Sequence, residues 1–176
     1  MHDWMSPDPV GLHAQARPEK LALVDLASGR RWTYRAFDAA IEKARAALVA
    51  LGGVLAVMAT PGAATRLAGL TVPRVPTAGE EFDRSDTYQA DVDARSAAAA
   101  SIAAAISLAA AACTIPALGW LACSGGGWVA AFCLAMAGAL VVYASRHHWA
   151  VPRASLTAAG LAAVVAAAVA APAHPV

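Results

Sequence analysis

Charged and uncharged residues are sharply segregated along this chain. All twelve acidic residues lie at or before Asp93, and beyond Arg95 only Arg146 and Arg153 carry a charge. A water-soluble domain normally carries charge along its whole length, because its surface is spread over the whole sequence. The pattern therefore divides the chain into a polar first half and a second half that we expect to lie in a lipid bilayer.

The uncharged stretch from Ser96 to Ser145 is too long for a single membrane helix. At about 1.5 Å per residue it would run far beyond a hydrocarbon core of about 30 Å. Three consecutive glycines, residues 125–127, are the natural break. A polar segment from Arg146 to Arg153 then precedes a last apolar run, in which Pro152 can start a helix. We predict three spans, at about residues 97–122, 128–145 and 154–171.

Aromatic and basic residues support these limits and suggest an orientation. Trp120, Trp128, Tyr143 and Trp149 fall at the expected water interfaces. The turn that contains Arg146 and Arg153 is basic, whereas the glycine turn is uncharged, so the positive-inside rule places the basic turn in the cytoplasm. We therefore expect a multi-pass protein of the plasma (inner) membrane with its N-terminus cytoplasmic and its C-terminus outside.

The uncharged residues 46–65 leave an alternative open. They could form a fourth span, which would place the first 45 residues outside. Gly52, Gly53, Pro61 and Gly62 interrupt this run, so three spans remain the preferred interpretation.

The first half predicts a small mixed segment followed by a linker. LALVD and RWTY read as short strands around the turn ASGR, and apolar positions at helical spacing predict an amphipathic helix from Arg35 to about Leu51. Gly52-Gly53 would end that helix. We expect residues 54–95 to be a polar cytoplasmic linker, extended where Pro73 and Pro76 occur. The fold class is thus a mostly α integral membrane protein with a small N-terminal strand–turn–strand–helix segment.

The sequence shows no pattern that indicates catalysis, a cofactor or a metal site. His147-His148 has no third ligand nearby, and the acids between Asp83 and Asp93 fit no calcium loop. Cys113, Cys123 and Cys133 are expected to be apolar helix residues. Arg146 and Arg153 are expected to anchor at headgroups of acidic lipid. The first half is nearly neutral, so no nucleic-acid partner is expected, and its opening residues predict no signal peptide.

Residues 8–51 resemble the opening of the adenylate-forming (AMP-binding) synthetase and ligase superfamily. The matching residues are Asp8-Pro9, His13-Ala14, Pro18-Glu19-Lys20, Ala22 to Asp25, Trp32-Thr33-Tyr34 and Phe37-Asp38. None of these is catalytic in that superfamily, and its ATP loop and catalytic lysine have no counterpart here. The resemblance therefore implies a ligase-like segment over residues 1–53 without implying activity.

Residues 54–176 resemble the type VII (ESX) secretion integral membrane proteins of the EccD family. The matching residues are Leu67-Ala68-Gly69, Val72-Pro73, Val75 to Gly79, Asp91 to Arg95 and Arg146 to Pro152. In that family a polar cytoplasmic linker joins two halves of a helix bundle. The resemblance implies a membrane domain over residues 96–176, with other secretion subunits or copies of the same chain as partners besides the lipid bilayer.

Three functional hypotheses follow. The preferred one is a non-enzymatic membrane subunit that corresponds to part of a type VII secretion protein. It would act by helix packing in a larger complex. The second is an inactive N-terminal fragment of an AMP-dependent synthetase or ligase, fused to membrane sequence near Gly52-Gly53. The third is an unrelated small membrane protein.

Overall fold

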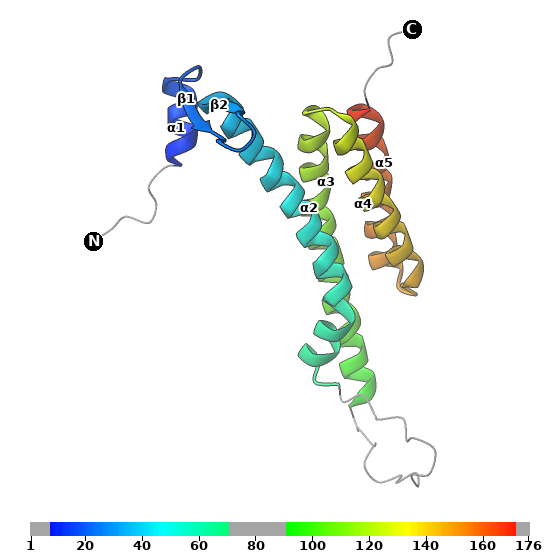
Figure 1. Ribbon diagram of the computed structural model, residues 1–176. Coiled ribbons are helices and arrows are strands. Elements are labelled where there is room, and N and C mark those ends of the chain that lie inside the picture. The colour runs from blue at the N-terminus through cyan, green and yellow to red at the C-terminus, as the bar shows by residue number, and fades with distance from the viewer. Residues whose placement is uncertain (1–7, 71–90, 172–176) are drawn as a thin grey trace, which may run out of the picture. The chain divides into compact units, whose positions relative to one another are not determined.

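The computed structural model describes residues 8–70 and 91–171, and they are mainly helical (Figure 1). The elements in chain order are α1 (Pro9–Ala16), β1 (Leu21–Val24), β2 (Arg31–Thr33), α2 (Tyr34–Leu67), α3 (Val92–Cys123), α4 (Gly127–Arg146) and α5 (Ala150–Ala170). The expected mostly α class, with a small strand pair before the long helices, is confirmed. The chain divides into two compact units, residues 1–48 and 49–176, which we call the N-terminal unit and the helical unit.

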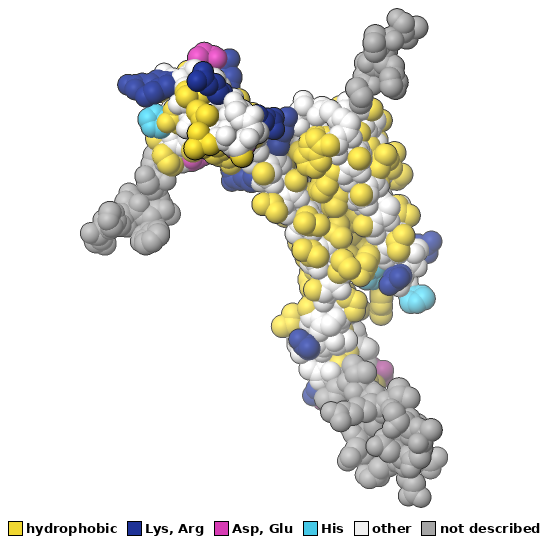
Figure 2. All heavy atoms as spheres, in the orientation of Figure 1, with side chains coloured by type: hydrophobic (Ala, Val, Ile, Leu, Met, Phe, Trp, Pro, Cys, Tyr) yellow, Lys and Arg dark blue, Asp and Glu magenta, His cyan; other side chains and the backbone are white. Residues whose placement is uncertain are grey.

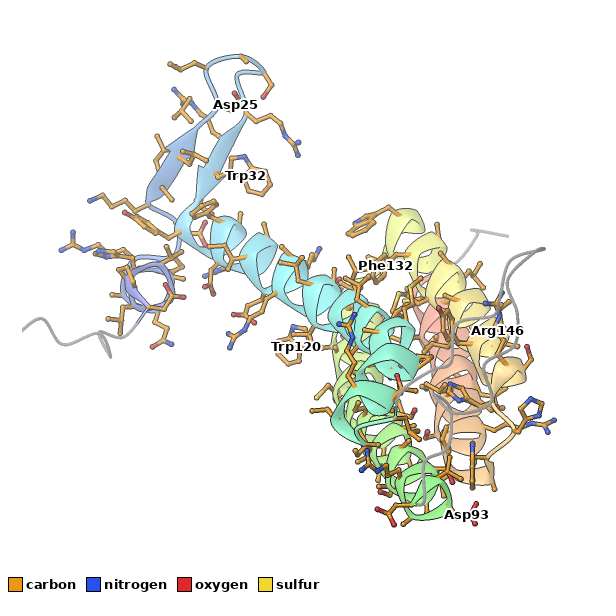
Figure 3. The ribbon with its side chains drawn as sticks, turned by 90° about the horizontal axis from the view of Figure 1, so that it is seen from below. Asp25, Trp32, Asp93, Trp120, Phe132 and Arg146 are labelled. Atoms are coloured by element: carbon orange, nitrogen blue, oxygen red, sulfur yellow. The ribbon has the colours of Figure 1, made fainter. Side chains whose placement is uncertain are left out.

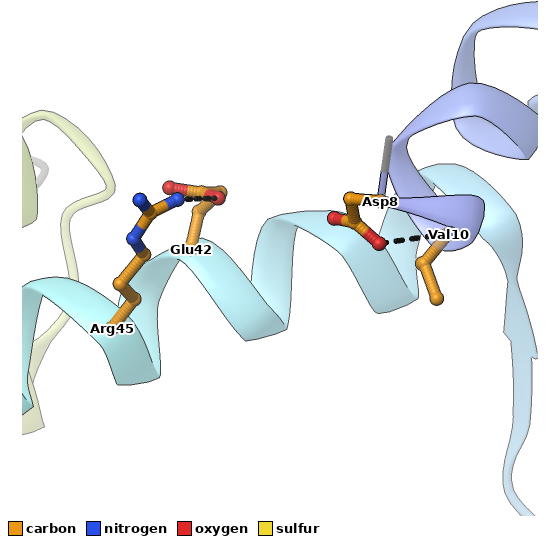
Figure 4. A network of polar contacts seen from close by, with 4 residues as sticks. All are labelled: Asp8, Val10, Glu42 and Arg45. Carbon is orange, nitrogen blue, oxygen red and sulfur yellow. Dashed lines mark hydrogen bonds and ion pairs between the residues drawn. The ribbon is translucent and has the colours of Figure 1, made fainter. Parts of the chain in front are cut away.

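Local hydrogen bonds organise the N-terminal unit. Asp8 caps α1 by accepting a hydrogen bond from the Val10 N–H at 3.0 Å, and Pro9 fits the first helical position (Figure 4). The antiparallel strands pair Leu21 with Thr33 and Val24 with Arg31, with an irregularity between Leu21 and Leu23.

Few side chains in this unit are covered. Ala46 is the only buried residue among its described residues, whereas Leu21 and Leu23 are nearly half exposed and Leu26, in the hairpin turn, is 94% exposed. Ion pairs join Arg35 to Glu19 at 3.1 Å and Arg45 to Glu42 at 3.3 Å, the latter drawn in Figure 4. Exposed pairs of this kind each contribute less than about 1 kcal/mol.

Helix α2 corrects one prediction. The helix was expected to end at Gly52-Gly53, but it continues through Pro61 to Leu67, so residues 54–67 are helical and do not begin an extended linker. A glycine pair ends a helix when water can hydrogen-bond the freed backbone groups, and an apolar environment offers no such alternative. The uncharged run also packs on one side, burying Ala50, Val54, Val57, Thr60 and Ala64.

The described residues therefore contain four helices that could cross a membrane, one more than the three expected, and α2 includes the residues 46–65 that the sequence left open as a fourth span. Helices α2, α3, α4 and α5 are each long and apolar enough by length and composition. Helix α4 matches its predicted span to within one residue at each end. Helices α3 and α5 begin five and four residues earlier than predicted, at Val92 and Ala150.

Helix α5 packs against both α3 and α4 through small residues. Its buried positions include Ala159, Gly160, Ala163, Ala166 and Ala167. A Cβ atom placed on Gly160 would lie 2.9 Å from Val141 Cγ2 and 3.6 Å from the Ala137 carbonyl oxygen of α4. Helices approach this closely only where small residues leave room for the facing backbone, which is the usual way that membrane helices associate.

Helices α2 and α3 make a second close contact. A Cβ on Gly53 would overlap the Thr114 hydroxyl oxygen of α3. Farther along, the Arg95 guanidinium donates a hydrogen bond of 2.6 Å to the Gly69 carbonyl just beyond α2. Gly53 of α2 thus faces residue 114 of α3, and Gly69, just beyond α2, faces residue 95, so the two helices are antiparallel.

The glycine turn between α3 and α4 is an ordered structure. Gly125 and Gly126 have φ angles of +61° and +109°, values that favour glycine. This conformation lets the Gly126 N–H donate to the carbonyl oxygen of Ala170, the last residue of α5, at 3.0 Å. The end of α3 therefore lies beside the end of α5, and these two helices run in parallel.

Candidate functional site

The helix directions bring all described charged residues of the helical unit to one end. The end of α2, the beginning of α3, the end of α4 and the beginning of α5 point toward this end, and α3, with 32 residues, extends beyond the turn between α4 and α5, which have 20 and 21 residues (Figure 1). Its charged residues are Arg66, Asp91, Asp93, Arg95, Arg146 and Arg153. Figure 2 shows the visible charged and histidine side chains of the unit toward this end, while the rest of its visible face is apolar. We call it the charged end.

The opposite end of the helical unit carries no charge in its described residues. The turn at residues 124–126 contains only Ser and Gly, and α5 ends at Ala170. Trp120 near the end of α3 and Trp128 at the start of α4 are 63% and 59% exposed there. Trp128 lies 6.0 Å from Phe132 between ring centroids. Exposed tryptophans beside an uncharged turn are typical of a membrane–water interface.

At the charged end, Arg95 joins two helices. Its guanidinium donates to the Gly69 carbonyl, which belongs to a residue with φ of +66° that follows the last turn of α2. A cation near the carbonyl groups at a helix C-terminus is favourable because it offsets their partial negative charge. Asp93 occupies the first turn of α3, where the helix dipole favours an anion (Figure 3).

The turn between α4 and α5 carries the other two arginines. Arg146 is the last residue of α4 and is exposed, with Cζ 5.7 Å from the centroid of the Tyr143 ring. Arg153 is exposed in the first turn of α5, and Trp149 between them is 58% exposed. Within residues 8–70 and 91–171, neither arginine forms an ion pair with a carboxylate. Arg146 is labelled in Figure 3.

Some of the residues that the sequence suggested as possible sites lie within the described parts of the chain, and others do not. No group of three or more His, Cys, Asp or Glu side chains that could hold a metal ion occurs in the described parts of the chain. His147 and His148 lie in the α4–α5 turn, and His148 is exposed. Cys113 and Cys123 are exposed, Cys133 is buried, and all three are free thiols. Asp83, Asp86 and the proline-containing part of the expected linker lie outside the described residues.

Three buried hydroxyl groups lie in the helices, and the sequence analysis did not single them out. Thr60 donates to the Ala56 carbonyl at 2.9 Å and Ser107 to the Ala103 carbonyl at 2.8 Å. The Thr114 hydroxyl, which faces Gly53, has no hydrogen-bond partner in the described structure. Their sequence signal is only a polar residue within an apolar run, which does not distinguish a buried side chain from one facing lipid.

The family model described as EccD-like transmembrane domain matches residues 30–175. No curated protein matches the chain. No solved structure matches it either.

The match bears directly on the two resemblances. It begins before Trp32-Thr33-Tyr34 and Phe37-Asp38, so it includes residues that also suggested a ligase. The ligase resemblance receives no support from the comparisons. The match also includes all four candidate membrane spans, which together form most of the helical unit. The chain therefore belongs to the EccD-like transmembrane domain family.

Proposed function

We propose that this protein is a membrane subunit of a type VII protein secretion system, which acts without catalysis by packing its helices against other subunits. The family match over residues 30–175 carries this proposal. The domain limits at residues 53 and 95 remain predictions within it.

The outward faces of the helices support a role in helix packing. Only about 28–39% of each candidate span's most apolar stretch is buried within the chain. Large apolar side chains project from α3, α4 and α5, including Leu108, Ile115, Leu134, Val142, Leu161, Val165 and Val169. Lipid can cover such faces, and so can helices of a neighbouring subunit.

Site-specific crosslinking can test the proposed association. A photoreactive amino acid at Val165, which is 63% exposed, should crosslink to a secretion subunit in cells that contain the system. The matched control is Ala163 of the same helix, which is fully buried and should crosslink only within the chain. The proposal fails if Val165 crosslinks to lipid alone and deletion of the protein leaves secretion unchanged.

We also propose that the charged end faces the cytoplasm of the inner membrane. For α3, α4 and α5 the support is direct, since one turn carries Arg146 and Arg153 and the other carries no charge. Four crossings then put both chain ends outside, whereas three crossings would leave the N-terminus in the cytoplasm. Five basic residues between Arg30 and Arg45 oppose this orientation of α2, so labelling must decide it.

Thiol labelling distinguishes these arrangements. In a protein whose three cysteines are replaced by alanine, single substitutions Ala27→Cys and His148→Cys would be treated in intact cells with a reagent that cannot cross the membrane. Four crossings predict labelling of Ala27→Cys and protection of His148→Cys. Protection of both would restore the three-span arrangement, and labelling of His148→Cys would reverse the orientation.

A further inference from the structure

We propose that the α4–α5 turn, residues 143–153, binds the phosphate group of an anionic lipid. This inference requires the protein to lie in a membrane, but it does not depend on a role in secretion. It assigns a ligand to a turn whose two arginines are the last charged residues of the chain.

The turn places two guanidinium groups at the ends of adjacent, packed helices. Arg146 ends α4, Arg153 lies in the first turn of α5, and only residues 147–149 separate the helices. Both arginines are exposed. Guanidinium groups suit phosphate because their donors are arranged in a planar fork that can bind two oxygen atoms at once.

Neighbouring side chains favour this role. The Arg146 guanidinium lies over the Tyr143 ring at 5.7 Å from its centroid, within the range of a cation–π contact. Trp149 is 58% exposed between the two arginines, and tryptophan prefers the headgroup depth of a bilayer. The arginine charges and the aromatic rings are therefore suited to the same depth.

No carboxylate in the described residues neutralises the pair. The described ion pairs use Arg35 and Arg45, both in the N-terminal unit, and the chain contains no acidic residue after Asp93. An anionic partner can therefore bind both guanidinium groups without displacing a described carboxylate. A lipid with net negative charge suits this pair better than a zwitterionic lipid, whose own ammonium group competes for the phosphate.

The start of α5 adds to the attraction without carrying it. Trp149 at the N-cap supplies no side-chain hydrogen bond, and Pro152 has no N–H to offer. The amide groups of Ala150 and Val151 therefore carry the partial positive charge of this helix N-terminus, in the same turn of α5 as Arg153. The arginine pair distinguishes the N-terminus of α5 from the N-terminus of α4, which begins in an uncharged glycine turn.

Native mass spectrometry of the full chain in detergent tests the proposal. Phosphatidylglycerol and phosphatidylcholine would be titrated separately, and the ratio of their dissociation constants measured. We expect a preference for phosphatidylglycerol of about 10-fold or more, since each arginine contributes about five-fold near an anionic surface. The double substitution Arg146→Gln/Arg153→Gln should bring the ratio close to one.

The matched control removes the same charge elsewhere. Arg30→Gln/Arg31→Gln alters two arginines of the N-terminal unit and should keep the preference. Arg146→Lys/Arg153→Lys should keep part of it, because the charge remains without the planar fork. Circular dichroism would verify that each variant retains its helices.

Four results would overturn the proposal. The first is equal binding of both lipids by the wild-type protein, and the second is a control variant that loses the preference as fully as the turn variant. The third is displacement of phosphatidylglycerol by inorganic phosphate at lipid concentrations, which would indicate a site for free anions. Loss of a protein partner from the turn variant, with its lipid preference intact, would indicate an acidic protein surface instead.

Discussion

The N-terminal unit and the helical unit both expose large apolar side chains, but this exposure has a different consequence in each unit. In the helical unit, Val165 and Leu161 project from a helix whose other face is buried against its neighbours. In the N-terminal unit, Leu21, Leu23 and Leu26 are exposed while only Ala46 is buried among the described residues. Exposure in the first case fits contact with lipid, and in the second it leaves little apolar contact to stabilise the hairpin.

The two units consequently depend on different interactions. The helical unit relies on close approach of small residues, such as Gly160 against Val141, where van der Waals contact replaces the hydrophobic effect. The N-terminal unit relies on caps, turn hydrogen bonds and exposed ion pairs. Substitutions that enlarge a small residue should therefore affect the helical unit strongly, whereas pH should act on the hairpin.

The largest effect is expected for Gly160→Leu. A side chain here must displace Val141 and push α5 away from the α4 backbone, which should lower the free energy of unfolding by about 2–3 kcal/mol. Unfolding by SDS in mixed micelles, followed by circular dichroism, would measure it. Gly138→Leu is the matched control, because no atom lies within 4 Å of its Cβ position. Equal losses in both variants would show that the α4–α5 contact is not close.

A smaller effect is expected for Gly126→Ala in the glycine turn. Its φ of +109° is strained for any L residue, so alanine should cost about 1–2 kcal/mol in the same unfolding assay. The hydrogen bond from Gly126 N–H to the Ala170 carbonyl would weaken as well. Gly127→Ala, in the first turn of α4, should be neutral or stabilising. A neutral Gly126→Ala would contradict the ordered turn.

Thr114→Val sharpens the comparison by removing a polar group from the helical unit. The buried Thr114 hydroxyl has no described partner, so replacing it with a methyl group should stabilise the unit by about 1 kcal/mol. Thr60→Val is the control, since its hydroxyl donates to the Ala56 carbonyl and its loss should bring no gain. Destabilisation by Thr114→Val would mean either that the hydroxyl has a partner or that Gly53 leaves no room for the larger methyl group.

The smallest effect concerns the hairpin turn of the N-terminal unit. Asp25 accepts hydrogen bonds from the Ser28 hydroxyl and, at 3.0 Å, from the Ala27 N–H, and these lower the pKa of its carboxyl below its usual value. Because the pKa is lowered in the folded state, the ionised carboxylate stabilises the folded turn at every pH above the pKa of the unfolded chain. This contribution is lost as the pH falls through the pKa of the folded state. The Ala27 amide should therefore lose protection from hydrogen exchange only below about pH 4.

An Asp25→Asn variant tests the origin of that pH dependence. Asparagine retains an acceptor oxygen but does not ionise in this range. Its Ala27 amide should exchange with little dependence on the same pH window. If the pH dependence persists unchanged, another carboxyl group controls the turn.

The spans illustrate how far sequence reasoning reaches. Hydropathy located α4 to within one residue, because glycines and Arg146 mark both of its ends. It placed the start of α3 too late, since helices can continue into polar sequence and Asp93 favours the first turn. The predicted end of α2 was wrong because it assumed that Gly52-Gly53 and Pro61 disrupt a helix as they do in water, where the broken ends can be hydrated.

The charged end was predictable only in part. The basic α4–α5 turn follows directly from Arg146 and Arg153 in the sequence. The presence of Arg66 and Arg95 at the same end depends on α2 running antiparallel to α3, which the contacts of Gly53 with Thr114 and of Gly69 with Arg95 establish. A helix that seemed to stop at residue 51 could not have suggested this arrangement.

The sequence by itself determined that the chain is a helical membrane protein with an uncharged glycine turn and a basic turn. Hydropathy and charge are properties of individual residues that add along the chain, so they can be read without knowing any contact. The tertiary structure alone decided that α5 packs on both α3 and α4 and that Gly160 and Gly53 lie at close contacts. Alanine-rich helices present small side chains on every face, so only the three-dimensional fit selects which faces meet.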